Sequence, residues 1–270
     1  MAYWNRKNTV KNLIGLFLLP WFMLFLLRWF EHRQTYFPSR SIRGSAESLA
    51  HPWEDAYFPT ADSQKINGWF FPARTNSPRA HLTVLLCHGN AGNIGDRFGL
   101  YDVLFQAGVN VFAFDYRGYG RSTGRPTEAG TYLDAQAAYE WLRNRGLAGT
   151  NIIALGESLG GGVAAELALR VPLRGLILQS TFTSVTDLGA ELFPWLPVRT
   201  LGTIRYDTVG KLAQIRIPIL VMHSRSDSIV GFHHGERLFA SAHEPKTFCE
   251  LAGDHNDTLS SGLERYREGL

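Results

Sequence analysis

Short apolar segments alternate with helix-like stretches along most of this chain, and this alternation constrains the fold more than any other feature. Apolar runs of four to eight residues between helices predict βαβ units, which build a mostly parallel sheet with helices on both faces. Upstream, DAYFPT and INGWFFPA predict two antiparallel strands at one edge of that sheet. The six apolar segments are HLTVLLCH, NVFAFDYRG, NIIALGES, LRGLILQS, PILVMHSRSD and KTFCELAGDH.

The alternation is interrupted at residues 181–215, where a longer segment replaces the expected short helix. An insertion here predicts a lid over the carboxyl edge of the sheet, where open α/β sheets bind ligands. The lid contains the apolar sequence Leu192-Phe193-Pro194-Trp195-Leu196-Pro197. This sequence indicates either a pocket for an acyl chain or a lid that packs inward as core.

An apolar segment near the N-terminus predicts a membrane helix. Residues 13–27 contain no charge, and Trp29 and Phe30 extend the apolar stretch. Residues 13–30 are therefore expected to form a single-pass membrane anchor, near the lower limit of about 17–25 residues for a span. Residues 1–12 would be its flank and residues 31–52 a polar linker. A cleaved signal peptide and a buried soluble helix are the alternatives, but no small-residue cleavage site follows. Basic residues on both sides leave the orientation open.

The motif Gly156-Glu157-Ser158-Leu159-Gly160 lies between an apolar run and a helix of small residues. This is the context of a nucleophile elbow, a sharp strand-to-helix turn that exposes a serine hydroxyl. Glycines two residues either side of Ser158 avoid a collision of side chains. The helix N-terminus behind Ser158 favours developing negative charge. The alternative is a glycine-rich turn with an incidental serine.

A serine nucleophile needs a base and a carboxylate that orients it. Asp227 and His255 follow successive apolar runs, so both are expected at the sheet edge that holds Ser158. Asp254 and Asp257 flank His255, and Asp207 lies in the lid; these are the competing acids. His223 is expected to be a packed residue, and His88 a structural hydrogen-bonding residue. The pair His233 and His234 is expected on a solvated helix face.

Two backbone N–H groups would stabilise an oxyanion next to Ser158. The first is that of Leu159, and the second is that of Asn90, with Ala91 as the near alternative. This chemistry requires no metal and no organic cofactor.

The composition excludes several other classes. The net charge is only +3 and the basic residues are scattered, so nucleic acid is not an expected partner. The glycine spacings match neither a dinucleotide loop nor a phosphate loop. Cys87 and Cys249 lie apart in apolar runs and are expected to be buried free thiols. The oligomeric state stays open.

With HGNAGN, DYRGYGRS, GESLGGG, SRSDSIV and GDHND in this order, residues 53–270 resemble the α/β-hydrolase superfamily. HGNAGN, DYRGYG and the N-terminal apolar segment together resemble its single-pass, membrane-anchored branch, which is related to protein depalmitoylases and their bacterial and fungal relatives. The resemblance implies an α/β-hydrolase domain over residues 53–270. It also implies a catalytic triad of Ser158, Asp227 and His255. The chain lacks the N-terminal cysteine cluster of the depalmitoylases.

The predicted function is that of a serine hydrolase, esterase- or thioesterase-like, with an acyl-enzyme on Ser158. Its expected partners are a small-molecule or lipid acyl ester or thioester and the membrane. A serine peptidase of the aminopeptidase type is an alternative, with Glu157 or Glu191 as the acid that would bind a free amine. A noncatalytic binding protein of the same fold is another.

Overall fold

The fold is organised around one eight-stranded sheet. The computed structural model describes the backbone of residues 2–270 and the side chains of residues 19–270. The strand order is β10-β9-β8-β7-β4-β6-β3-β2, with parallel pairing from β10 to β6 and antiparallel pairing of β6 with β3 and of β3 with β2. The predictions of a mostly parallel sheet and of an antiparallel edge are confirmed. The strands are β2 (Glu54–Pro59), β3 (Lys65–Phe71), β4 (Thr83–Cys87), β6 (Asn110–Phe114), β7 (Ile152–Glu157), β8 (Gly175–Gln179), β9 (Ile219–Ser224) and β10 (Lys246–Leu251).

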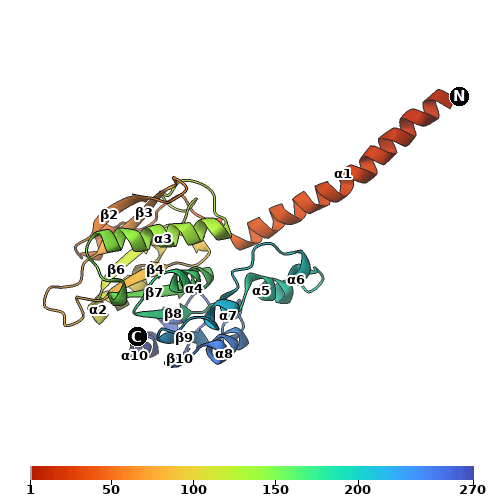
Figure 1. The fold of residues 1–270 in the computed structure, drawn as a ribbon. Coiled ribbons are helices and arrows are strands. Elements are labelled where there is room, and N and C mark those ends of the chain that lie inside the picture. The colour runs from red at the N-terminus through yellow and green to blue at the C-terminus, as the bar shows by residue number, and fades with distance from the viewer. Residues whose placement is uncertain (1) are drawn as a thin grey trace.

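Helices cover both faces of the sheet, as Figure 1 shows. Successive residues of a strand point to opposite faces, so Leu85 and Cys87 pack in one core and Val84 and Leu86 in the other. The first core is shared with α3 (Glu128–Asn144), α4 (Leu159–Arg170) and α8 (Phe232–Ser241). The second is shared with α2 (Phe98–Ala107) and α10 (Leu263–Gly269). Because both faces of the central strands β4, β6 and β8 are buried, these strands are mostly apolar, whereas buried and exposed residues alternate along the edge strand β2. The short helices outside the lid are η1 (Ala46–Leu49), η2 (Ile94–Asp96), η3 (Gly149–Asn151) and α9 (Thr258–Ser261).

The lid contains three short helices, α5 (Val185–Leu192), α6 (Val198–Leu201) and α7 (Thr208–Leu212). Ser184 caps α5 by accepting the N–H of Asp187, and Asp207 caps α7 by accepting the N–H of Gly210. The helix α7 packs against α4, so only α5 and α6 lie away from the body of the sheet (Figure 1). The part of the lid that lies away from the sheet is therefore shorter than the lid predicted over residues 181–215.

The N-terminal helix α1 (Ala2–Thr35) projects from the domain (Figure 1). It is followed by β1 (Phe37–Pro38), which pairs with β5 (Ala91–Gly92). Residues 31–35 are thus helical and half-buried or buried for the most part, which differs from the polar linker predicted over 31–52. The difference arises because Glu31 and Thr35 bond to residues far along the chain.

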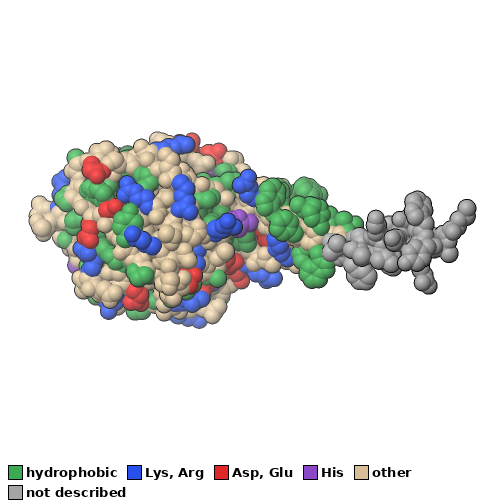
Figure 2. All heavy atoms as spheres, turned by 90° about the horizontal axis from the view of Figure 1, so that it is seen from above, with side chains coloured by type: hydrophobic (Ala, Val, Ile, Leu, Met, Phe, Trp, Pro, Cys, Tyr) green, Lys and Arg blue, Asp and Glu red, His purple; other side chains and the backbone are tan. Residues whose placement is uncertain are grey.

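The predicted anchor, residues 13–30, falls partly outside the described residues, because the side chains of 13–18 are among those not described. Within the part of the chain that the structure does describe, no helix combines the length and apolar character needed to cross a bilayer. Figure 2 shows hydrophobic side chains covering α1 where it leaves the domain. They belong to Leu19, Trp21, Phe22, Met23, Leu24, Phe25, Leu26 and Trp29, all exposed.

Candidate active site

Ser158 lies on a strained turn between β7 and α4. Its φ and ψ are 51° and −116°, a region that non-glycine residues rarely adopt. A Cβ at Gly156 would overlap the carbonyl group of Gly160, and a Cβ at Gly160 would overlap the carbonyl oxygen of Cys87. The two glycines of the motif are thus required by the close approach of backbones. The Ser158 N–H donates to the carbonyl of Gln179 at 2.9 Å, which helps to hold the turn.

Two further predicted residues meet Ser158 at this edge of the sheet. The Nε2 atom of His255 lies 3.1 Å from Ser158 Oγ, and Nδ1 of His255 lies 2.8 Å from Oδ2 of Asp227. The other oxygen of Asp227 accepts the N–H groups of Ile229 and Val230 at 3.0 and 2.7 Å. The carboxylate is therefore fixed in place, and it orients the imidazole with Nδ1 as donor and Nε2 as acceptor toward the serine.

The competing acids, Asp254, Asp257 and Asp207, have roles other than binding the imidazole of His255. Asp254 accepts from the backbone N–H of His255, and from the N–H and hydroxyl of Ser228, so it shapes the loop rather than contacting the imidazole. Asp257 precedes α9 as its N-cap residue, and Asp207 caps α7. Asp227 is thus the acid that the fold brings to the ring of His255.

The other histidines near the site are structural. His223 is buried and donates from Nε2 to the carbonyl of Val230 at 2.8 Å. Burial lowers the pKa of His223, so it stays neutral beside Asp227. His88 is also buried and donates from Nδ1 to the carbonyl of Gly89 at 2.7 Å.

His233 and His234 do not share a solvated face, so that prediction is wrong for one of the pair. His234 is fully buried, and its Nδ1 accepts the N–H of Thr183 at 3.2 Å. The proton of His234 is then on Nε2, which donates to Glu191 at 3.2 Å. His233 contacts the same carboxylate at 3.0 Å. The side-chain nitrogen and oxygen atoms of His233, His234 and Glu191 that could bind a metal lie within 4.8 Å of one another. These contacts link α5 to α8.

The loop after β4 borders the serine. Gly89, Asn90 and Ala91 line the same cavity as Ser158. The carbonyl of Asn90 accepts the N–H of Phe37 at 3.0 Å and the hydroxyl of Tyr119 at 2.8 Å. Leu159 is the first residue of α4, and the first N–H groups of a helix have no partner within it. Leu159 and Asn90, the two residues predicted to supply the oxyanion donors, thus line the same cavity as Ser158.

Glu157 forms an ion pair, which bears on the alternative of a free-amine pocket. Its carboxylate lies 2.8 Å from Nε of Arg97, whose Nη2 also donates to the carbonyl of Ala91 at 2.9 Å. Burial lowers the pKa of Arg97, but the adjacent Glu157 carboxylate, together with other nearby acidic groups, outweighs this effect and keeps that pKa above its ordinary value, so Arg97 stays charged beside Glu157. Glu191, the other acid considered, contacts the two histidines and does not line the cavity.

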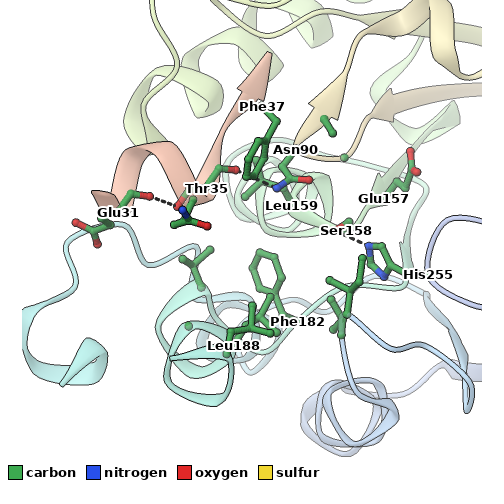
Figure 3. Close-up of a pocket in the computed structure, with 18 of the residues that line it drawn as sticks. Glu31, Thr35, Phe37, Asn90, Glu157, Ser158, Leu159, Phe182, Leu188 and His255 are labelled. Atoms are coloured by element: carbon green, nitrogen blue, oxygen red, sulfur yellow. Dashed lines mark hydrogen bonds between the residues drawn. The ribbon is translucent and has the colours of Figure 1, made fainter. Parts of the chain in front are cut away.

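A cavity of about 630 Å³ opens at Ser158 (Figure 3). This volume lies in the range of small-molecule sites, about 300–1,000 Å³. Figure 3 shows Phe182 and Leu188 on the lid side of the cavity, Ser158 and His255 together, and Glu31 and Thr35 from α1 on the far side. Its lining away from Ser158 is mostly apolar, with Phe182, Val185, Leu188, Leu192, Phe193 and Leu196 from the lid.

The sequence-based prediction missed the contribution of α1. Leu27, Phe30, Glu31, Gln34 and Thr35 line this cavity. Their only local signal is the change from an uninterrupted apolar run to a mixed one after Leu27. That change does not reveal which residues they contact.

The serine lies on a strained strand-to-helix turn at the carboxyl edge of a mostly parallel sheet, and a histidine links it to a carboxylate. This arrangement defines the nucleophile-elbow class of α/β proteins. Comparisons with known proteins agree with this fold class. Residues 83–208 match the model of the alpha/beta hydrolase fold. An uncharacterised protein of Mycobacterium tuberculosis is 40% identical over 229 residues, which cover 84% of this chain and 81% of that protein.

The alpha/beta hydrolase domain-containing protein WAV2 of Arabidopsis thaliana is 33% identical over 270 residues, covering 89% of this chain and 86% of the relative. Among solved structures, an esterase of Pyrococcus furiosus superposes with a TM-score of 0.72 at 20% identity, covering 87% of this chain and 95% of the esterase. The chain belongs to the α/β-hydrolase family.

Proposed function

We propose that this chain is a serine hydrolase that cleaves carboxylic ester or acyl-thioester bonds through an acyl-enzyme on Ser158. The observation that carries the proposal is the unbroken series of hydrogen bonds from Ser158 through His255 to Asp227. These are the residue types and the order of contacts that activate a hydroxyl as a nucleophile. The strained turn supports the same role, since backbone strain of this kind clusters at functional sites.

The geometry supports acyl transfer to water. His255 Nε2 takes the proton of Ser158 as Oγ attacks the carbonyl carbon of the substrate. Asp227 keeps the second proton of the ring on Nδ1 and stabilises the imidazolium. The N–H groups of Leu159 and Asn90 would hold the oxyanion. His255 then protonates the departing oxygen or sulfur, activates a water that attacks the acyl-enzyme, and returns its proton to Ser158 as the acid leaves.

The cavity favours an acyl group over a charged amine. Its lid side is apolar, and Glu157, the carboxylate nearest Ser158 in sequence, is neutralised by Arg97. The Pyrococcus furiosus protein of similar fold is an esterase, which is compatible with this choice. An acyl chain held in thioester linkage on a protein falls in the same substrate class.

We also infer that residues 13–30 associate with a membrane. The support is the row of exposed large apolar side chains on α1, among them Trp21 at 70% and Phe25 at 63% exposure. Apolar patches of this kind mark membrane or protein interaction sites. Flotation of the full chain with phospholipid vesicles tests this. The Trp21→Lys, Phe25→Lys double variant should float less. Equal flotation of the two proteins would contradict the inference.

The test of the hydrolase proposal compares an ester, a thioester and an amide of the same fatty acid. The wild type should hydrolyse the ester and the thioester, whereas Ser158→Ala should lose essentially all of that activity. Hydrolysis of the amide alone would overturn the esterase assignment in favour of a peptidase. If the wild type hydrolyses none of the three substrates, the result would support the alternative of a noncatalytic binding protein.

A further inference from the structure

The cavity at Ser158 has two walls that come from distant parts of the chain. The lid forms one wall through α5, α6 and the turn between them, and the last turns of α1 form the other through Leu27, Phe30, Glu31 and Gln34. In Figure 3 the lid residues Phe182 and Leu188 lie opposite Thr35 and Glu31 of α1. The space between them opens directly at Ser158.

Direct contacts join α1 to the lid. The rings of Phe30 and Phe193 meet edge to face with centroids 5.3 Å apart. Arg28 donates to the carbonyl of Leu201 at 2.6 Å. The Glu31 carboxylate accepts the N–H of Ile204 at 2.8 Å. This end of α1 is therefore built into the domain.

The same end of α1 also touches the loop beside Ser158. The side-chain amide of Asn90 donates to the carbonyl of Thr35 at 3.1 Å, and the N–H of Phe37 donates to the carbonyl of Asn90 at 3.0 Å. The helix end, the lid and the predicted oxyanion loop thus form one bonded set around the cavity.

The apolar face of α1 continues from the cavity to the outside. Residues three and four apart share a helix face, so Met23 and Leu24 lie one turn before Leu27 on its side. Met23 is 58% exposed and Leu24 is 40% exposed, whereas Leu27 is half-buried at the cavity. On the lid, Leu192 and Trp195 are also exposed. An apolar path therefore leads from the outer surface of α1 into the cavity.

We propose that α1 and the lid together form a binding site for a long acyl chain, and that Leu27 and Phe30 of α1 set how long a chain is accepted. The site rests on the proposed function, since the chain would belong to the ester or thioester that Ser158 attacks. The acyl chain lies between α1 and α5, with its carbonyl carbon at Ser158 Oγ and its tail directed along α1. The N-terminal helix is then a specificity element in addition to any anchoring role.

The test uses the full chain with Leu27→Trp, which adds bulk at the α1 wall. The matched control is Leu169→Trp, a substitution at an exposed leucine of α4 that does not line the cavity. Each protein is assayed on the p-nitrophenyl esters of acetate and decanoate. Because shortening a pocket by a methylene or more changes kcat/KM by about tenfold or more, the decanoate-to-acetate ratio should fall at least that far in Leu27→Trp. The ratio should stay at the wild-type value in Leu169→Trp.

A binding measurement keeps the test independent of catalysis and of the hydrolase proposal. Laurate is titrated into full-length Ser158→Ala with and without Leu27→Trp, and thermal unfolding checks that both are folded. Laurate should bind Ser158→Ala and bind the double variant at least about tenfold more weakly. Equal laurate affinity, or an unchanged ester ratio in a folded Leu27→Trp protein, would overturn the acyl-chain site. If the wild type hydrolyses neither ester but laurate binding depends on Leu27, the hydrolase proposal fails and the acyl-chain site stands.

Discussion

The carboxylate of Glu31, near the end of α1, accepts both the backbone N–H and the hydroxyl of Thr203 in the lid, at 2.5 and 2.7 Å. The two residues are 172 positions apart in the chain. Because Glu31 also lines the cavity at Ser158, the position of the lid over the site depends on the position of α1. Attachment of α1 to a membrane would thereby fix how the cavity faces that membrane.

Glu31→Gln should loosen the lid without unfolding the domain. A hydrogen bond to a charged group contributes about 1.5–3 kcal/mol, and the amide keeps only one acceptor oxygen. Since about 1.4 kcal/mol is a factor of ten, a loss within that range corresponds to at least about tenfold faster amide exchange. Hydrogen exchange of a peptide that contains Thr203 and Ile204 measures this change in exchange rate. Glu264→Gln, a change at a highly exposed carboxylate of α10, is the control. Unchanged exchange in Glu31→Gln would show that these bonds do not hold the lid.

Gly160→Ala should destabilise the protein. A methyl group there would overlap the carbonyl oxygen of Cys87, and overpacking of this kind costs about 1–3 kcal/mol. Urea unfolding gives the change in free energy. Gly99→Ala is the matched control, because its Cβ would meet only Leu259 Cδ1, at 3.8 Å, and alanine favours a helix. Wild-type stability in Gly160→Ala would contradict the close backbone approach.

Asp227→Asn should lower kcat by about 10⁴-fold with the fold intact, because an amide no longer selects the imidazole tautomer with Nδ1 as donor. Asp254→Asn, the change of the carboxylate next to His255 in sequence, should have a much smaller effect. Steady-state kinetics on one ester compares them. If Asp254→Asn were the more damaging of the two, Asp227 would not be the orienting acid.

The free energy of unfolding should fall as pH is lowered through about 6.5, the pKa of an unfolded histidine. Burial lowers the pKa of His223 and His234 in the folded protein, so below that pH the unfolded chain binds more protons than the folded one. Urea midpoints across a pH series measure the decline. His234→Gln should reduce the slope, whereas His81→Gln, at an exposed position, should leave it as in the wild type. A slope unaffected by His234→Gln would rule out this residue as a source.

The strands and the elbow were predictable because their signals are local. A buried parallel strand is an apolar run, and the turn at Ser158 demands glycine at positions 156 and 160. Chain order and strand ends were then enough to predict that Asp227 and His255 would lie at the same sheet edge. The structure places them in hydrogen-bond contact with each other.

The contacts of α1 and of His234 could not be predicted in this way. Glu31 bonds to Thr203, and His234 bonds to Thr183 and Glu191, all through long-range packing. A polar residue beside another polar residue carries no local mark of burial, so the sequence alone predicts a surface position for both His233 and His234. The apolar run before Leu27 indicated a membrane segment but did not show that the helix would continue into the wall of the cavity.

Labelling with a fluorophosphonate probe, followed by peptide mapping, tests the central claim most directly. A single adduct on Ser158 is predicted in the wild type, with none at this position in Ser158→Ala and much slower labelling in His255→Ala. Absence of any adduct from the folded wild type, or modification of another serine while Ser158 stays free, would contradict the account.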